Sequence, residues 1–306
     1  MRFGYVVRDP SNQTYSEIRD LTVKVEKLGF ESVHVTDHFF RFGDMEKRKT
    51  PFLESNILLA ALARETQKIK LAHIVMCNSF RNPAQSAKII LTLDHLSNGR
   101  ALLWVGAGWF KEEYDAYGYP FPSAKRRVDE FEESLTIFKK VFTEDITNFE
   151  GNFWKLENHI NYPKSIQKPY PQIVVGTNTG KRMIDIACRE ADGVNLANIV
   201  PRDQKMFNES ISLINERLKK YGRDFEEFET SIYTYVRIVD SQETLEKVRK
   251  EKGIFKSVMK YQFMGDLNTI QEKIQEVEDL GVKKMVIILE SPVIDDPFTL
   301  FGKELM

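Results

Sequence analysis

Apolar and polar positions follow two alternating periods along the whole chain. Short runs of β-branched and aromatic residues are typical of buried strands, and between them apolar residues recur every three or four positions, as on one face of a helix. The predicted strands are Phe3–Val7, Ser32–Asp37, Ile69–Cys77, Ala101–Val105, Gln172–Val175, Gly193–Ala197, Thr230–Val239 and Lys284–Leu289. The predicted helices are Tyr15–Leu28, Leu53–Thr66, Pro83–Leu96, Lys125–Phe142, Thr179–Glu190, Asp203–Lys220, Ser241–Lys250 and Leu267–Leu280.

This alternation predicts about eight strand–helix units, which is the pattern of a (β/α)8 TIM barrel of about 250 residues with the excess in loops. An open doubly wound sheet alternates in the same way, but it normally carries a glycine fingerprint after its first strand. Here Arg8-Asp9-Pro10 follows instead, so the barrel is preferred. The segment FEGNFWKL (149–156) predicts a small hairpin inserted near residues 145–160 and turning at Gly151-Asn152. We expect residues 1–306 to form one domain.

The composition and charge balance exclude some classes of binding partner. The chain has 306 residues, 42% hydrophobic and 29% charged, as expected for a globular enzyme. With 44 Lys and Arg against 45 Asp and Glu, no net field would attract nucleic acid or an anionic membrane. Neither a signal-type segment nor a long apolar run is present, and Cys77 and Cys188 lie too far apart in sequence to indicate a disulfide framework. These features favour a cytoplasmic protein with reduced thiols and argue against nucleic acid or a membrane as its partner.

The first candidate for chemistry is the run SVHVTDHF (32–39), where an apolar strand ends on Asp37 and His38. The carboxyl ends of barrel strands are where active sites form, and a histidine there can donate, accept or relay a proton near neutral pH. The alternative is structural, with His38 closing the strand and Asp37 capping the next turn.

A second candidate is the loop Gly176–Arg182, which joins a strand to a helix. Backbone N–H groups, hydroxyls and two cations at a helix N-terminus suit a phosphate. Alternatively, the loop is an ordinary turn in which Asn178 or Thr179 caps the helix. The Gly106-Ala107-Gly108 run lacks a third glycine at fingerprint spacing, so it is a weak dinucleotide motif and fits a tight turn equally well.

Other chemistries have little support. His34 and His38 are four residues apart on an extended strand, a separation of over ~10 Å, and the remaining histidines show no common ligand spacing, so no metal site is expected. No P-loop or Gly-x-Ser-x-Gly elbow is present, which argues against kinases and hydrolases. Arg81, Arg126 and Arg127 are predicted to form structural salt bridges.

Several segments in order resemble one family. They are TDH (36–38), SFRNPAQSAKIILTLDHLSNGR (79–100), VGAGWFKEEYDAYGYPF (105–121), RVDEFEESLTIFKKVF (127–142), the FEGNFWKL hairpin, KPYPQIVVGTNTGKRMIDIACREADGVN (168–195) and GVKKMVII (281–288). Together they resemble the bacterial luciferase-like flavin and deazaflavin oxidoreductases. The GAGW and EEY pattern is most similar to the branch that depends on coenzyme F420.

The resemblance implies a barrel whose carboxyl-end loops bind a tricyclic cofactor, with the ring near Asp37 and His38. It implies a cis peptide beside the ring near Ile74-Val75, although a plain buried strand is the alternative. Trp109 and Tyr114 would wall the substrate pocket, unless they are local core. The implied cofactor-binding residues are Ile74, Val75, Gly106, Gly108, Gly176, Thr177, Asn178, Thr179 and Gly180.

The activity implied is hydride transfer between coenzyme F420 and a small organic substrate, with His38 as proton relay or hydrogen-bond partner and Asp37 orienting it or positioning the first loop. Trp109 stands where the sugar-phosphate dehydrogenase branch has an acidic residue, which argues against a sugar phosphate. One alternative is a monooxygenase that uses reduced FMN and molecular oxygen, and another is a non-catalytic flavin-binding protein. Family members often pair through barrel helices, so the resemblance is compatible with a homodimer. The apolar helix Ile89–Leu96 is the candidate interface, but a core-facing position of this helix is the stronger alternative.

Overall fold

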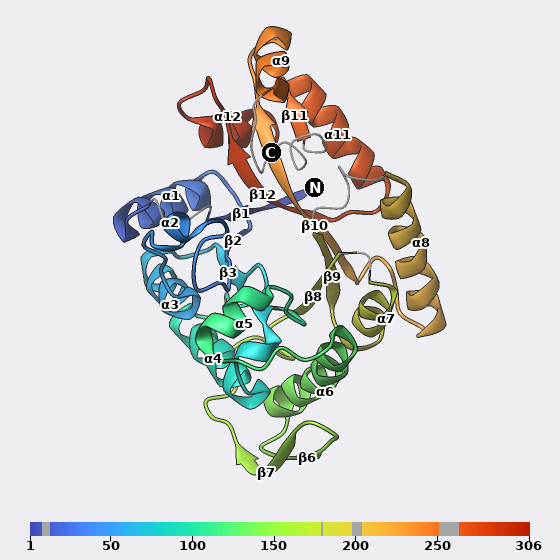
Figure 1. Ribbon diagram of the computed structural model, residues 1–306. Coiled ribbons are helices and arrows are strands. Elements are labelled where there is room, and N and C mark those ends of the chain that lie inside the picture. The colour runs from blue at the N-terminus through green and yellow to red at the C-terminus, as the bar shows by residue number, and fades with distance from the viewer. Residues whose placement is uncertain (8–12, 179, 198–203, 251–262) are drawn as a thin grey trace. The chain divides into compact units, whose positions relative to one another are not determined.

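The computed structural model describes residues 1–7, 13–178, 180–197, 204–250 and 263–306 (Figure 1). Its strands are β1 (Arg2–Val6), β2 (Ser32–Val35), β3 (Lys70–His73), β4 (Met76–Cys77), β5 (Leu103–Gly106), β6 (Ile146–Glu150), β7 (Lys155–Ile160), β8 (Ile173–Thr177), β9 (Gly193–Ala197), β10 (Glu229–Ile238), β11 (Phe263–Gly265) and β12 (Lys284–Glu290). Its α-helices are α1 (Tyr15–Lys27), α2 (Met45–Arg48), α3 (Ser55–Glu65), α4 (Pro83–Leu96), α5 (Lys111–Tyr117), α6 (Ala124–Thr143), α7 (Lys181–Glu190), α8 (Gln204–Lys220), α9 (Gln242–Lys250), α11 (Leu267–Asp279) and α12 (Pro297–Glu304).

The chain divides into two compact units. Unit 1 contains Met1–Val6, Lys24–Val33 and Gly176–Met306, and unit 2 contains Val7–Val23 and His34–Val175. The prediction of a single domain stays a prediction.

Unit 1 is built on parallel strands. β12 pairs with β1 and β10, and β10 also pairs with β9 and β11. Side chains such as Ile232 and Val286 are fully buried, as expected for apolar runs covered on both faces. Helix α12 closes over β1, where Phe301 packs edge-on against Phe3 with ring centroids 5.1 Å apart.

Unit 2 has the same construction. β5 pairs in parallel with β4 and β8, and Leu71 of β3 forms a parallel bridge to Ala101. Helices α3, α4 and α6 lie side by side along the strands, and their inward faces bury residues such as Leu62 and Phe138 (Figure 1). These strands are parallel, and helices alternate with strands along the described chain, which confirms the predicted (β/α)8 barrel class.

The inserted hairpin is also confirmed, as the antiparallel pair β6–β7. Its turn differs from the prediction, because it spans residues 151–154 rather than Gly151-Asn152 alone. The N–H of Gly151 donates to the carbonyl of Trp154 at 2.9 Å, and Glu133 accepts from the N–H groups of Asn152 and Phe153 at 2.7 and 3.0 Å. A Cβ on Gly151 would lie 2.4 Å from the Glu133 carboxylate, so this close approach requires glycine.

The segment LDHLSNGR has a structural role. Asp94 is fully buried and accepts hydrogen bonds from the Ser165 hydroxyl at 2.8 Å and the Gln167 amide at 2.7 Å, which fixes the chain before β8. Arg100 donates to the carbonyls of Ala63, in the last turn of α3, and Ile69, just before β3, both at 2.7 Å, and thereby satisfies two buried backbone acceptors.

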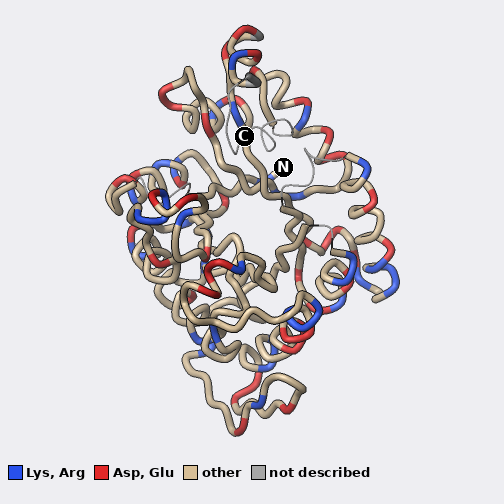
Figure 2. Tube along the Cα trace, viewed as in Figure 1, with Lys and Arg blue, Asp and Glu red and all other residues tan. Residues whose placement is uncertain are grey.

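Charged residues of both signs are interspersed, mostly on helices and loops (Figure 2). Within the described residues, no helix has the length and apolar character needed to cross a bilayer. Cys77 and Cys188 are both free, and both are buried.

Candidate active site

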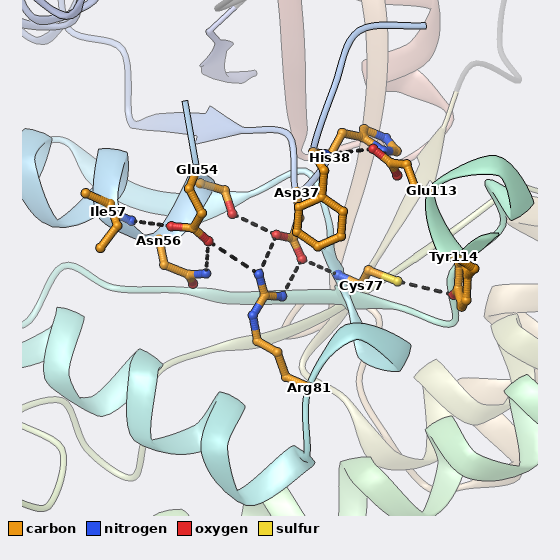
Figure 3. Close-up of polar contacts among 11 residues, drawn as sticks. Asp37, His38, Glu54, Asn56, Ile57, Cys77, Arg81, Glu113 and Tyr114 are labelled. Atoms are coloured by element: carbon orange, nitrogen blue, oxygen red, sulfur yellow. Dashed lines mark hydrogen bonds and ion pairs between the residues drawn. The ribbon is translucent and has the colours of Figure 1, made fainter. Parts of the chain in front are cut away.

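Asp37 lies just after β2 and is almost completely buried. Its carboxylate accepts hydrogen bonds from the Ser55 hydroxyl at 2.7 Å and the Cys77 N–H at 2.8 Å, and Arg81 contacts both oxygens at 2.7 and 2.9 Å (Figure 3). Burial alone would raise the pKa of Asp37, but the hydrogen bonds and charge of Arg81 outweigh it and lower that pKa to about 2. Asp37 therefore remains ionised and ties β2, α3 and β4 together.

His38 turns away from Asp37 and toward helix α5. Its Nδ1 lies 2.7 Å from Oε2 of Glu113, a carboxylate that has no exposed surface (Figure 3). The other oxygen of Glu113 accepts from the N–H of Phe39 at 2.7 Å. Asp37 was predicted to orient His38 or to position the first loop. The carboxylate that contacts the His38 ring is Glu113, whereas the contacts of Asp37 hold the loop after β2.

Aromatic side chains surround the imidazole of His38. The rings of Phe42, Trp109 and Phe110 lie edge-on to it, with centroid distances of 4.6, 6.1 and 6.1 Å. Trp109 is 65% exposed and Phe42 43% exposed, and their rings lie against each other with centroids 5.5 Å apart. The exposed parts of these rings form an apolar wall at the edge of the site. Trp109, which was predicted to line the substrate pocket, is part of this wall.

Tyr114 does not contribute to that wall. Helix α5 turns its ring inward, where it is fully buried against Cys77 and Phe80, and its hydroxyl contacts Cys77 Sγ at 3.4 Å. Burial raises the pKa of the Cys77 thiol to about 12 and also raises the pKa of Tyr114. The prediction that Tyr114 lines the substrate pocket is therefore corrected to a supporting position behind it.

Gly106 ends β5, and Gly108 follows the strand at the same end of unit 2. Gly106 pairs with Cys77 across β4 and β5, and Gly108 has φ +79°. A Cβ on Gly108 would lie 1.9 Å from the Tyr114 hydroxyl. This position therefore requires glycine for both its backbone conformation and its packing.

The predicted non-prolyl cis peptide is confirmed between Ile74 and Val75. It lies in the gap between β3 and β4, and the N–H of Ile74 donates to the carbonyl of Val35 at 2.9 Å. The preceding residue, His73, is fully buried, and neither ring nitrogen has a hydrogen-bond partner in the described structure. Burial lowers the pKa of His73 to about 4.

Unit 2 thus gathers Asp37, His38, Ile74, Val75, Gly106, Gly108 and Trp109 at the carboxyl ends of β2, β3 and β5. Among the predicted arginines, Arg81 and Arg126 form the expected ion pairs, with Asp37 and Glu130. Arg127 instead donates to the carbonyls of Gly108 and Pro122. Within the described ranges, no cluster of three or more His, Cys, Asp and Glu is arranged to hold a metal.

The predicted phosphate loop belongs to unit 1. Gly176 and Thr177 end β8, Asn178 forms a bend, and Gly180 is the N-cap of α7 without a side-chain cap. Among the described residues, no side chain therefore caps the first N–H groups of α7, and free N–H groups are what a phosphate site requires. Thr179 lies outside the described residues.

Glu113 is the residue that sequence reasoning missed. The EEY run resembles the solvated first turn of a helix, and its neighbour Glu112 is indeed exposed and paired with Arg48. The sequence offered one indication of this role, which is the position of Glu113. It directly precedes the buried Tyr114, in the segment that follows Gly108.

Comparison with known proteins identifies the family. The profile of the luciferase-like monooxygenases matches residues 1–286. The chain belongs to this family. Among curated luciferase-like relatives, an F420-dependent glucose-6-phosphate dehydrogenase of Intrasporangium calvum is 33% identical over 180 residues, covering 58% of this chain and 52% of the relative. An FMNH(2)-dependent dimethylsulfone monooxygenase of Pseudomonas putida is 30% identical over 192 residues, covering 62% and 51%. The chain thus spans about half the length of these curated relatives.

Solved structures match over nearly the whole luciferase-like chain. An F420-dependent secondary alcohol dehydrogenase in complex with an F420-acetone adduct aligns with a TM-score of 0.83 at 18% identity, covering 99% of this chain and 98% of the other. A coenzyme F420-dependent tetrahydromethanopterin reductase from Methanopyrus kandleri aligns with a TM-score of 0.79 at 22% identity, covering 99% and 97%. At these identities the matches establish the fold.

Proposed function

We propose that this protein is a coenzyme F420-dependent oxidoreductase that transfers a hydride between the deazaflavin and a small organic substrate. The observation that carries the proposal is His38, held at the carboxyl end of β2 by Glu113 and surrounded by partly exposed aromatic rings. When bound, the deazaflavin supplies the hydride acceptor or donor. His38 exchanges the accompanying proton with the substrate.

Two features of the described residues, each considered within its own unit, suit a part of such a cofactor. In unit 1, the uncapped N-terminus of α7 behind Gly176 and Gly180 suits the phosphate of the cofactor tail. In unit 2, Asn78 follows β4 directly, is 3% exposed, and its Oδ1 has no hydrogen-bond partner among the described residues. An N–H donor on a bound ring would satisfy this buried acceptor.

The aromatic wall also bears on the substrate. Phe42, Trp109 and Phe110 offer flat apolar surface beside His38, which favours a substrate with an apolar group next to its reacting carbon. Trp109 occupies the position where the resemblance places an acidic residue in sugar-phosphate dehydrogenases. We therefore propose a substrate other than a sugar phosphate.

Reduced FMN with molecular oxygen is the second candidate, supported by the identity to the dimethylsulfone monooxygenase. The same unit 1 loop suits the FMN phosphate. Consumption of oxygen separates the candidates, because hydride transfer to a deazaflavin needs none.

Separate titrations with oxidised coenzyme F420 and with FMN test the proposal, followed by cofactor absorbance and tryptophan fluorescence. Trp109 is 65% exposed beside His38, so its emission should change on binding, and a Trp109→Phe control should lose that part of the signal. Tight F420 binding with weak FMN binding supports the proposal. The reverse, together with oxygen consumption, supports the monooxygenase, and binding of neither contradicts the cofactor assignment.

A His38→Asn variant addresses the proton step. It should bind the cofactor like the parent but lose about 10²-fold or more in turnover, as expected when a general acid–base group is removed. Unchanged turnover with every accepted substrate would contradict this role of His38.

A further inference from the structure

We propose that Glu113 is a positioning residue that fixes the tautomer of His38, keeping the proton on Nδ1 and leaving Nε2 as the acceptor that faces the substrate. The inference rests on the proposed function for its catalytic meaning. Its structural content concerns only Glu113, His38 and Phe39.

The contacts of Glu113 define a rigid clamp. Its Oε1 accepts from the backbone N–H of Phe39 and its Oε2 lies against Nδ1 of His38, both at 2.7 Å. The carboxylate has no exposed surface, so water does not compete for either oxygen. Because one of the two contacts is to the backbone beside His38, the carboxylate cannot rotate without losing a buried hydrogen bond.

The direction of the second hydrogen bond follows from chemistry. A carboxylate has no proton to give, so Nδ1 of His38 is the donor. A neutral imidazole carries one proton, and Nε2 is then left with its lone pair. Among the described residues, no other hydrogen bond to the ring of His38 is present, so Nε2 stays available within the aromatic wall.

This arrangement makes Nε2 the ring nitrogen that exchanges a proton with the substrate. Nε2 can take the proton that a hydroxyl-bearing substrate loses from oxygen as it gives up a hydride from carbon. In the reverse reaction the protonated ring returns that proton from Nε2 to the carbonyl oxygen. In both directions Glu113 stabilises the charged ring through Nδ1 without itself exchanging a proton.

Glu113→Gln is the decisive variant. The Gln carbonyl retains the bond from the Phe39 N–H, and this orients its NH₂ group toward Nδ1. An amide NH₂ can only donate, so Nδ1 must become an acceptor and the ring proton must move to Nε2. Glu112→Gln is the matched control, because it makes the same change at the adjacent, 54% exposed carboxylate.

The measurement is ¹⁵N NMR of protein labelled at histidine, without cofactor, with the His38 signals assigned by their loss in His38→Asn. We expect the Nδ1–H tautomer in the parent and in Glu112→Gln, and the Nε2–H tautomer in Glu113→Gln. An Nε2–H tautomer in the parent would overturn the proposal, even if the Gln variant failed to fold. An unchanged tautomer in a folded Glu113→Gln protein would overturn it as well.

Turnover supplies the functional test. With coenzyme F420 and an accepted substrate, Glu113→Gln should lose about 10²-fold in kcat, while Glu113→Asp, which keeps a carboxylate, should recover part of it. A normal kcat in Glu113→Gln would contradict the positioning role. Because the NMR experiment needs no cofactor, a failure of F420 binding and a failure of this inference give different results.

Discussion

Arg81 and Asp37 form a buried, bidentate ion pair, with Nη1 2.7 Å from Oδ2 and Nη2 2.9 Å from Oδ1. The Arg81 side chain is 11% exposed and that of Asp37 is 2% exposed. The pair joins the loop after β2 to the start of α4, and Asp37 also accepts the N–H of Cys77. It therefore holds in place the backbone that carries His38.

Replacing Arg81 by Leu leaves this carboxylate buried and without its cation. We expect the free energy of unfolding to fall by about 3–5 kcal/mol, as for other broken buried pairs. Arg126→Leu is the control, since Arg126 is 61% exposed in its pair with Glu130 and should cost no more than about 1 kcal/mol. Urea denaturation measures both, and equal losses would contradict the structural role of the pair.

His73 should make stability depend on pH. Its folded pKa of about 4 lies below the ordinary value of 6.5, because burial disfavours the charged ring. The unfolded chain therefore takes up the proton first, so stability is full above pH 6.5 and declines as the pH falls toward 4. The loss across this window should reach roughly 3 kcal/mol.

His73→Leu should remove this dependence, because it removes the titrating ring. His95→Asn removes an exposed histidine instead and is the matched control for the loss of a histidine as such. Asp37 loses its contribution only below pH 3.8, so its titration does not overlap this window. Unfolding curves at several pH values test this, and a parent slope retained in His73→Leu would refute it.

The substitution Gly108→Ala tests how closely the loop after β5 packs against α5. Ala at this position combines an unfavourable φ of +79° with a Cβ 1.9 Å from the Tyr114 hydroxyl. We expect a loss of roughly 2–5 kcal/mol from the backbone conformation and the overpacking together. Gly118→Ala isolates the first cause, because Gly118 has φ +73° but open space around it, and it should cost only about 1–2 kcal/mol.

The Tyr114→Phe change should rescue part of the Gly108→Ala loss, since it removes the clashing hydroxyl. The rescue stays incomplete because the ring carbon that bore the hydroxyl remains 3.2 Å and Cys77 Sγ 2.9 Å from the added Cβ. Thermal unfolding of the single and double variants measures the coupling. Strict additivity would show that the hydroxyl is not the obstacle.

The regular elements could be predicted because their apolar positions repeat over many residues. The run Lys284–Leu289 corresponds to β12 at Lys284–Glu290, and Lys125–Phe142 corresponds to α6 at Ala124–Thr143. The short helices α2 and α5 were missed, since four and seven residues give too few turns for a helical period to appear. The strand predicted as Ile69–Cys77 is two strands, interrupted at Ile74–Val75.

The site was predictable only in part. Asp37 and His38 could be found because strand ends in a barrel are identifiable from sequence. Their partners could not, because Arg81 is 44 residues from Asp37 and Glu113 is 75 residues from His38. Whether Glu112 or Glu113 is buried depends on how α5 packs, and the same packing removed Tyr114 from the pocket and left Trp109 exposed.

Substitution of Trp109 should weaken substrate binding without changing the stability of the fold. Its side chain is 65% exposed, so Trp109→Ala should change the free energy of unfolding by no more than about 0.5 kcal/mol. Ile57→Ala, at an apolar side chain that is 72% exposed on α3, is the control for loss of exposed apolar surface.

If the aromatic wall binds the apolar part of the substrate, Trp109→Ala should raise KM about tenfold, which corresponds to ~1.4 kcal/mol, while Ile57→Ala leaves it unchanged. Trp109→Phe keeps a flat ring and should retain most of the affinity. Steady-state kinetics with apolar alcohols of increasing size measure the effect, and an equal KM in parent and Trp109→Ala across that series would remove Trp109 from the substrate site.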